Sequence, residues 1–282
     1  MSRIVYVNGE YLPEEQARVS VFDRGFIFAD AVYEVTAVLN GKLVDNAGHL
    51  KRLGRSLDEL RIAWPVSADD LVAAQETLVE RNGLQEGTVY LQISRGAADR
   101  DFGFPADAVS TLVMFTQARS LLDSPAAKTG IKIISVPDIR WQRRDIKTVG
   151  LLGPVLAKQA ALDAGAQDAW MIEDGFVTEG SSNNAYIVTQ DGVLVTRHLG
   201  NEILHGITRA SVLELGKRDG VPIEERAFSI EEAYAASEAM MSSASTFVYP
   251  IVEIDGRQIG DGQPGPIARR LRELYIERAL SA

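Results

Sequence analysis

Asn-Gly pairs near the start of the chain constrain its fold more than any other feature. Each pair stands between two short segments that are rich in strand-forming residues. Asn-Gly is the preferred dipeptide of the type I′ turn, which joins antiparallel strands. The first part of the chain is therefore expected to contain antiparallel hairpins. The predicted hairpins cover residues 5–12 and 32–44, with their turns at 8–9 and 40–41.

Segments with helical periodicity alternate with further predicted strands. Leu50, Leu53 and Leu57 fall on one face of a helix. Ser67 is suited to cap the next helix, and Ser229 begins a capping box that ends at Glu232. We predict helices at 48–62, 67–82, 151–164 and 207–218, one from Ser229 and one from Pro266. We predict further strands at 89–93, 111–116, 131–136, 169–172, 184–188 and 193–196.

The length and one irregular segment indicate two domains. A chain of 282 residues is too long for one small core. Residues 119–129 contain a Ser-Pro pair and lose periodicity, which is typical of a linker. The expected organisation is an N-terminal domain of residues 1–118, this linker, and a C-terminal domain of residues 130–282. Because both domains mix helices with sheets, the predicted fold class is α+β.

Charge and residue usage exclude several classes of function. The net charge of −10 disfavours nucleic acid, whose binding needs a basic face. No apolar run approaches the roughly 20 residues that cross a bilayer, and we expect no signal peptide. The chain has no cysteine and only three histidines, so no metal site is expected. We expect a soluble cytoplasmic protein.

Two polar segments are candidate binding sites. Gly206 opens a helix that continues with Ile207 and Thr208, and the free N–H groups of such a helix start attract phosphate. The alternative is an ordinary helix start. Residues 177–185 place Glu179 and several small polar residues before an apolar strand, which favours a binding loop. The alternative is a polar turn with a solvated glutamate.

Basic side chains give further candidates. Lys147 follows three arginines in residues 140–148 and is a candidate for an amine that forms an imine, with a solvated basic loop as the alternative. Arg52 and the arginines of residues 95–100 are suited to bind an anion or a carboxylate, or lie on a solvated surface. Composition and spacing alone thus predict an anion-binding protein of two domains and leave the reaction open.

Short motifs are spread along almost the whole chain. They are DRGF at 23–26, DAVYEV at 30–35, HLKRL at 49–53, DIRW at 138–141, DIK at 145–147, LLGPVLAKQ at 151–159, TEGSSN at 178–183 and ILHGITR at 203–209. In this order they resemble the D-amino acid aminotransferases among the fold-type IV enzymes, which use pyridoxal 5′-phosphate (PLP). That superfamily also includes branched-chain aminotransferases and aminodeoxychorismate lyases.

The resemblance implies a two-domain fold-type IV enzyme with PLP in the cleft between its domains. Lys147 would carry PLP as an imine and move a proton, and Glu179 would pair with the pyridine nitrogen. Tyr33 and Arg100 would face the substrate carboxylate, with Arg100 reaching in from a second subunit, so a homodimer is expected. The other residues expected to bind PLP are Arg52, Ser181, Ser182, Leu204, Ile207, Thr208 and Thr246.

The implied reaction is a ping-pong transamination between small amino and keto acids, with D-alanine and 2-oxoglutarate as the expected pair. Phe102 departs from the family pattern, in which a histidine stands two positions after the arginine that corresponds to Arg100. Phe102 removes a hydrogen-bond donor and adds apolar surface near the expected substrate site. The alternatives are a branched-chain or (R)-amine transaminase, an aminodeoxychorismate lyase, and a binding protein without activity. Lys147 and Glu179 together disfavour the last of these.

Overall fold

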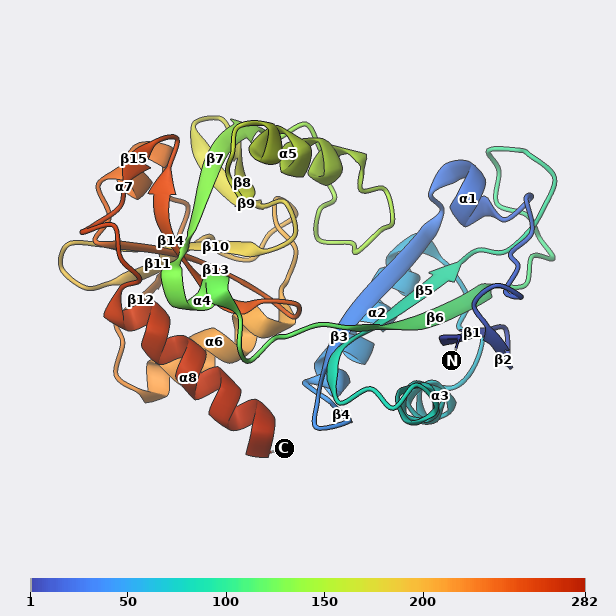
Figure 1. Ribbon diagram of the computed structural model, residues 1–282. Coiled ribbons are helices and arrows are strands. Elements are labelled where there is room, and N and C mark those ends of the chain that lie inside the picture. The colour runs from blue at the N-terminus through green and yellow to red at the C-terminus, as the bar shows by residue number, and fades with distance from the viewer. Residues whose placement is uncertain (1, 282) are drawn as a thin grey trace. The chain divides into compact units, whose positions relative to one another are not determined.

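The computed structural model describes residues 2–281, which form two compact units (Figure 1). Unit 1 contains the chain up to Ser120 together with Ile146–Gly150, and unit 2 contains Leu121–Asp145 and the chain from Leu151 onward. The domain boundaries predicted from the sequence assign residues 146–150 to the C-terminal part. The structure instead places this segment in unit 1, because its backbone pairs with a strand there.

Unit 1 is built on an antiparallel sheet with the strand order β2-β1-β6-β5-β3-β4. Its strands are β1 (Ile4–Val7), β2 (Glu10–Pro13), β3 (Ala31–Leu39), β4 (Lys42–Leu43), β5 (Glu86–Ser94) and β6 (Thr111–Ala118). Both predicted hairpins are present. Asn8 and Gly9 have positive φ, as do Asn40 and Gly41, which is the geometry of the type I′ turn.

The described residues of unit 1 form the helices α1 (Arg24–Phe28), α2 (Asn46–Leu60) and α3 (Ala68–Arg81). Helices α2 and α3 cover one face of the sheet (Figure 1). Leu53, Leu57 and Leu78 are fully buried in the resulting core, and each buried leucine stabilises the fold by about 1.5–3 kcal/mol. The Ser67 hydroxyl accepts a hydrogen bond from the Asp70 N–H, so the predicted cap is confirmed.

Unit 2 is built on a mixed sheet with the order β12-β11-β10-β13-β14-β7-β8-β9, and β15 pairs with β14. Its strands are β7 (Ile131–Pro137), β8 (Asp168–Glu173), β9 (Phe176–Gly180), β10 (Asn184–Val188), β11 (Leu194–Thr196), β12 (Ile223–Glu225), β13 (Glu238–Ser243), β14 (Phe247–Ile254) and β15 (Arg257–Gln258). Its helices are α4 (Pro125–Thr129), α5 (Leu152–Asp163), α6 (Ile207–Arg218), α7 (Ile230–Tyr234) and α8 (Pro266–Ser281).

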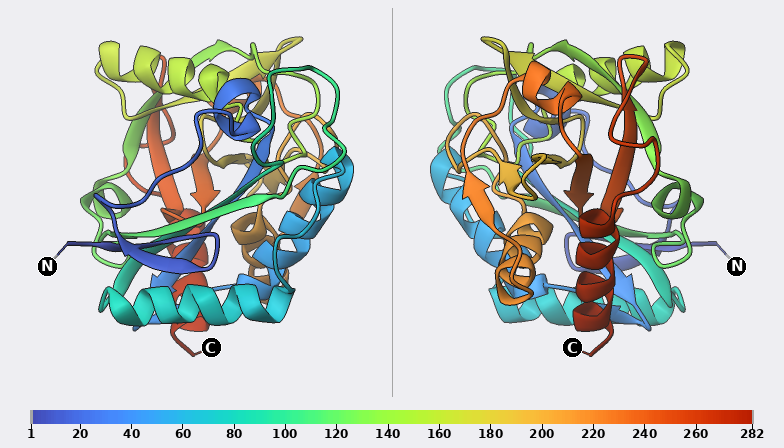
Figure 2. Two further views of the ribbon diagram at one scale, coloured as in Figure 1. Left: turned by 90° about the vertical axis from the view of Figure 1, so that its right-hand side faces the viewer. Right: turned by 90° about the vertical axis from the view of Figure 1, so that its left-hand side faces the viewer.

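Helices α6 and α8 lie side by side in unit 2 (Figure 2). Arg270 of α8 donates to Asp219 at the end of α6, and Arg278 donates to Glu214. Ser229 and Glu232 form the predicted capping box of α7. None of the helices in residues 2–281 combines the length and the apolar character needed to cross a membrane.

Several elements of unit 2 differ from the sequence predictions. Strands β13 and β14 lie in the middle of the sheet, but no strand was predicted there. Every residue of β13 except its last is buried, so the strand lacks the alternation of polar and apolar residues that marks a half-exposed strand. Residues 125–129 form helix α4, although the sequence predicts an irregular linker there.

Candidate active site

Lys147 is fixed by backbone hydrogen bonds to unit 1. Its carbonyl accepts from the Tyr33 N–H at 3.0 Å, and the Val149 N–H donates to the Ala31 carbonyl at 3.1 Å. The Lys147 N–H donates to the Ser56 hydroxyl of α2 at 3.3 Å. The segment therefore runs beside β3 like a short extra strand, and this arrangement determines where the lysine side chain begins.

The amine of Lys147 lies over an aromatic ring. Its Nζ is 4.1 Å from the centroid of the Tyr33 ring. Tyr33 stacks on Tyr90 at 5.6 Å, and Tyr90 stacks on Phe115 at 4.7 Å, so the row of rings restricts the movement of Tyr33. Within the described residues of unit 1, Lys147 forms no ion pair. The amine is therefore available to a reacting group.

Arg52, a predicted anion-binding residue, is buried and binds Glu34 with two hydrogen bonds. Arg52 Nε and Nη2 donate to Glu34 Oε1 and Oε2 at 2.8 and 2.6 Å. The Nδ1–H of His49 donates to Glu34 Oε2 at 2.7 Å. Successive side chains of a strand point to opposite faces, so Glu34 faces α2 while Tyr33 lies on the other face of β3. Both arginine and histidine reach Glu34 from α2.

Burial and charge together set the ionisation of this cluster. Burial opposes a charged Glu34, but Arg52 and His49 outweigh that effect and lower the pKa of Glu34 to about 2. Burial lowers the pKa of His49 below its usual range, so the imidazole is neutral near pH 7. Neither Glu34 nor His49 is among the site residues predicted from the sequence. Their only signal was their place in the DAVYEV and HLKRL motifs.

Glu179, near the end of β9, is a buried carboxylate with donors on both oxygens. Its Oε2 accepts from the Leu204 N–H at 3.0 Å and from Asn184 Nδ2 at 3.1 Å. Its Oε1 accepts from Arg140 Nη1. Asn184 Nδ2 also donates to the Leu204 carbonyl at 3.0 Å. These donors fix the orientation of the carboxylate, so the alternative of a solvated glutamate is wrong.

Arg140 connects Glu179 to a second buried acid, Asp138. Arg140 Nε and Nη2 donate to Asp138 Oδ1 and Oδ2 at 3.0 and 2.7 Å, and the Thr178 hydroxyl donates to Oδ2 at 2.6 Å. Burial opposes ionisation of Asp138, but Arg140 prevails and holds the pKa of Asp138 below its usual range. Burial also opposes the charge on Arg140, yet Glu179 and Asp138 raise the pKa of Arg140. This arginine is therefore not part of a solvated loop.

The start of α6 lies beside Glu179. Its N-cap, Gly206, has no side chain to accept from the first N–H groups of the helix, which have no partner within the helix either. A Cβ on Gly206 would stand 2.0 Å from Asn184 Oδ1, so only glycine fits beside this asparagine. Asn184 thus brings Glu179, Leu204 and the helix start together in unit 2. Asn184 is not among the site residues predicted from the sequence.

Thr246 belongs to a loop at the same end of the sheet. Asn184 of β10 pairs with Ser242 of β13, and loop residues 244–246 follow almost directly. Thr246 Oγ1 is 2.8 Å from Ser243 Oγ, and Ser245 Oγ is 3.2 Å from the same oxygen. These hydroxyls and the helix N–H groups are the donors that a phosphate needs. The buried carboxylate suits a protonated ring nitrogen, so the residues fit PLP.

Ser181 and Ser182 lie in the turn that follows β9. The Ser181 hydroxyl donates to Asp168 Oδ1 at 2.6 Å, and Asn183 Nδ2 donates to Asp168 Oδ2 at 3.0 Å. Ser182 is exposed. Ser181 therefore anchors the turn between Glu179 and β10 on a buried aspartate.

Arg100 and Phe102 lie on an exposed loop of unit 1. The Arg100 guanidinium lies over the rings of Phe28 and Phe102 at 5.3 and 5.6 Å, and these rings are 5.4 Å apart. Phe102 is 78% exposed. Arg95 of the same loop is committed internally, because its Nε and Nη2 donate to both carboxylate oxygens of Asp30 at 2.7 and 2.9 Å.

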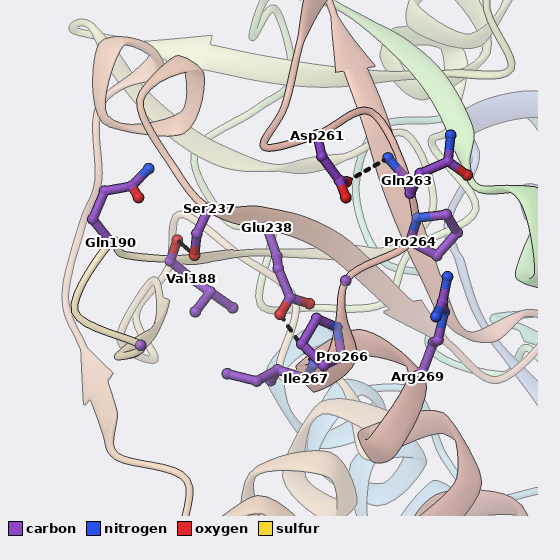
Figure 3. Close-up of a pocket in the computed structure, with 12 residues that line it drawn as sticks. Val188, Gln190, Ser237, Glu238, Asp261, Gln263, Pro264, Pro266, Ile267 and Arg269 are labelled. Atoms are coloured by element: carbon purple, nitrogen blue, oxygen red, sulfur yellow. Dashed lines mark hydrogen bonds between the residues drawn. The ribbon is translucent and has the colours of Figure 1, made fainter.

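A cavity of about 590 Å³ in unit 2 contains none of the predicted site residues (Figure 3). Its lining includes Glu238, whose carboxylate accepts from the N–H groups of Ile267 and Ala268 at 3.0 and 2.9 Å. Glu238 thereby caps the start of α8. Asp261 in the same lining accepts from the Gln263 N–H at 2.9 Å (Figure 3). These acids are used structurally, and the cavity is separate from the residues around Glu179.

Comparison with known proteins identifies the family. Residues 31–254 match the model of amino-transferase class IV. The D-alanine aminotransferase of Staphylococcus aureus (strain N315) is 38% identical over 279 residues, which make up 97% of this chain and 98% of that relative. Both matches extend over the residues that the geometry brings together in each unit.

Solved structures show the same fold. The branched-chain amino acid aminotransferase of Escherichia coli has a TM-score of 0.93 at 24% identity, covering 99% of this chain and 95% of that chain. The T.th. branched-chain amino acid aminotransferase with pyridoxamine 5′-phosphate has a TM-score of 0.92 at 28% identity, covering 100% and 95%. The fold-type IV architecture predicted from the sequence is confirmed. The chain belongs to the class IV aminotransferases, which use PLP to transfer amino groups.

Proposed function

We propose that this aminotransferase moves the amino group of D-alanine to 2-oxoglutarate in a ping-pong reaction. The observation that carries the proposal is the amine of Lys147, which lies over Tyr33 and forms no ion pair within the described residues of unit 1. The proposal is supported by the 38% identity to the D-alanine aminotransferase of S. aureus over almost the whole chain.

The donors described above are assigned to PLP. When bound, PLP supplies an aldehyde that takes up nitrogen and a ring that withdraws electrons from the substrate α-carbon. Glu179 would hold the ring nitrogen and favour its protonated form, and Leu204 would support one face of the ring. Ser181 is assigned an indirect role, because its hydrogen bond to Asp168 holds the turn that follows Glu179. The phosphate is assigned to Arg52, the N–H groups of Ile207 and Thr208 and the Thr246 hydroxyl.

Lys147 is assigned the transfer of the proton. Its amine would act as a general base and acid that takes up the proton of the substrate α-carbon and later gives it back. Its backbone is bonded to β3 and its Nζ lies over the Tyr33 ring, so unit 1 fixes the position of the amine. A base that is fixed on one side selects one enantiomer of the substrate.

Tyr33 and Arg100 are assigned to the substrate carboxylate, with Arg100 supplied by a second subunit. A homodimer is supported by large apolar side chains that unit 1 exposes in its loops and in α1, which a second subunit would cover. These side chains are Val21, Phe22, Phe26, Phe102 and Val109. A cytoplasmic location stays a prediction from the sequence.

A substrate panel tests the proposal. The PLP-loaded protein is given D-alanine, L-leucine or an (R)-arylalkylamine, each with 2-oxoglutarate, and formation of glutamate is measured. We expect D-alanine to react with the highest kcat/KM. Faster turnover of L-leucine would contradict the proposal in favour of a branched-chain aminotransferase, the activity for which the similar solved structures are named. Release of p-aminobenzoate from aminodeoxychorismate would instead indicate a lyase.

A further inference from the structure

Arg272 of α8 is a buried cation that donates to backbone carbonyls. It is 8% exposed, and its Nη1 donates to the carbonyls of Thr246 and Val248 at 2.8 and 3.1 Å. Its Nη2 donates to the carbonyls of Leu121 and Leu122. Within residues 2–281 no carboxylate forms an ion pair with this arginine.

A charge buried in this way destabilises the folded protein unless something offsets it. Removing a guanidinium from water costs several kcal/mol, and neutral carbonyls return only part of that free energy. Burial accordingly lowers the pKa of Arg272. Met or Leu would fill a similar volume without this loss of hydration. The presence of a charge therefore suggests a role beyond packing.

The carbonyls that Arg272 binds flank a strained residue. Phe247 has a φ of +58°, a conformation that is unfavourable for a bulky side chain by about 1–2 kcal/mol. It follows the three-residue loop 244–246 that joins β13 to β14, and glycine usually takes this position in such hairpins. Arg272 Nη1 bridges the carbonyls on both sides of Phe247, and the Phe247 ring packs at 5.0 Å from the ring of Tyr275. Helix α8 thus holds the end of the loop at two points.

We propose that Arg272 is a positioning residue for the cofactor phosphate, because it fixes the loop that carries the Thr246 hydroxyl and adds positive charge next to it. The inference rests on the proposed function, in which Thr246 binds the phosphate. The hydrogen bond to the Thr246 carbonyl holds that residue in place directly. Since no carboxylate in residues 2–281 pairs with Arg272, its charge also favours a doubly negative group at the loop.

The test compares PLP with pyridoxal, which has the same ring and aldehyde but no phosphate. Dissociation constants of both are measured by absorbance on cofactor-free protein. The variants are Arg272→Met, which loses the charge and the bridge, and Arg272→Lys, which keeps only the charge. The matched control is Arg270→Met, because Arg270 lies on the same helix but forms an exposed ion pair with Asp219. Circular dichroism checks that each variant is folded.

We expect Arg272→Met to weaken PLP binding by roughly 10- to 100-fold, the range for losing hydrogen bonds from a charged group. Pyridoxal binding should change by less than about threefold, and Arg270→Met should leave both constants at the wild-type value. If Arg272→Met does not fold, the affinities of Arg272→Lys test the inference instead. We expect this variant to bind PLP more weakly than wild type, by a smaller factor, and to bind pyridoxal as wild type does. An equal loss for PLP and pyridoxal in the folded variant overturns the inference, because a purely structural role affects both.

A wrong proposed function gives a different experimental result from a wrong inference about Arg272. In that case the wild-type protein itself does not prefer PLP to pyridoxal, and borohydride reduction does not attach PLP to Lys147. The inference then falls together with the function on which it rests. If the wild type passes both checks, the variants alone decide the role of Arg272.

Discussion

Arg140 donates a hydrogen bond to Glu179 in unit 2, and the same guanidinium holds Asp138 by two further hydrogen bonds. One cation therefore serves two acids that are both largely removed from water. The position of the Glu179 carboxylate consequently depends on an arginine 39 residues earlier in the chain.

Arg140→Met is expected to affect stability and the cofactor together. Two buried carboxylates lose their shared cation, so the free energy of unfolding should fall by about 3 kcal/mol. Glu179 also loses one of the donors that orient it, so the absorption maximum of bound PLP should shift. Urea unfolding and absorption spectra measure these effects. Arg257→Met is the control, since that exposed arginine in the same unit should change neither quantity. An unshifted spectrum in folded Arg140→Met would show that Glu179 does not depend on Arg140.

Lys147→Ala should abolish transamination and leave the fold intact. The hydrogen bonds of this residue to Tyr33 and Ser56 come from its backbone, so they remain after truncation. We expect the free energy of unfolding to change by less than about 1 kcal/mol, while glutamate formation falls to the uncatalysed level. Stopped assays and urea unfolding give both values. Lys51→Ala, in an exposed position on α2, is the matched control. Normal turnover by Lys147→Ala would overturn the assignment of the lysine.

Elements with local signals are predictable from the sequence. Strand β10 (Asn184–Val188) and helix α6 (Ile207–Arg218) have the predicted bounds, because a short apolar run marks the strand, and Gly206 and Asp219-Gly220 mark the two ends of the helix. Strand β14 has no such signal. Pro250 argues against a strand, since it cannot donate to a neighbouring strand. Only pairing with the distant strands β7 and β13 makes this segment extended, and such pairing has no local pattern.

In the candidate site, too, features with a local sequence signal are predictable, and features that depend on distant contacts are not. Lys147, Arg52 and Glu179 are candidates from the sequence because each stands in a short motif, but the motifs do not indicate the side chains that bind Arg52 and Glu179. The hydrogen bonds that join Glu34 to Arg52 and Arg140 to Glu179 span 18 and 39 residues. Charge and spacing along the chain cannot predict such pairs, because they depend on how strands and helices pack. For the same reason the sequence did not place residues 146–150 in unit 1.

Phe102→His should change substrate preference without affecting stability. Arg100 lies over the Phe102 ring, and the substitution weakens that contact by about 0.5–1 kcal/mol while it adds a hydrogen-bond donor. We expect kcat/KM for D-glutamate or D-aspartate, relative to bulkier apolar D-amino acids, to rise by roughly three- to tenfold. Phe104→His is the matched control, because that ring lies beside Arg95 rather than Arg100. If the specificity profile of Phe102→His equals that of wild type, position 102 does not take part in substrate selection.

Acid should destabilise unit 1 through His49 and Glu34. Burial lowers the pKa of His49 in the folded protein, so the unfolded chain binds more protons below about pH 6.5 and stability begins to fall there. The pKa of Glu34 is lowered from 4.5 to about 2, so its contribution is complete above pH 4.5 and is lost as the pH falls towards 2. That difference corresponds to about 3 kcal/mol. Urea unfolding at several pH values measures the decrease in the free energy of unfolding that His49 and Glu34 each cause.

The Glu34→Gln variant isolates the contribution of the Glu34 carboxylate to the loss of stability in acid. At pH 7 the substitution leaves the buried Arg52 without its negative partner, so the free energy of unfolding should fall by about 3 kcal/mol. Between pH 4.5 and 2 the variant should lose less stability than wild type, because the group whose protonation weakens the fold is gone. Glu76→Gln, on the exposed side of α3, should follow the wild-type curve at every pH. Parallel curves for Glu34→Gln and wild type across this range would show that Glu34 is not the titrating group, and the Arg52–Glu34 ion pair would then not explain the acid sensitivity.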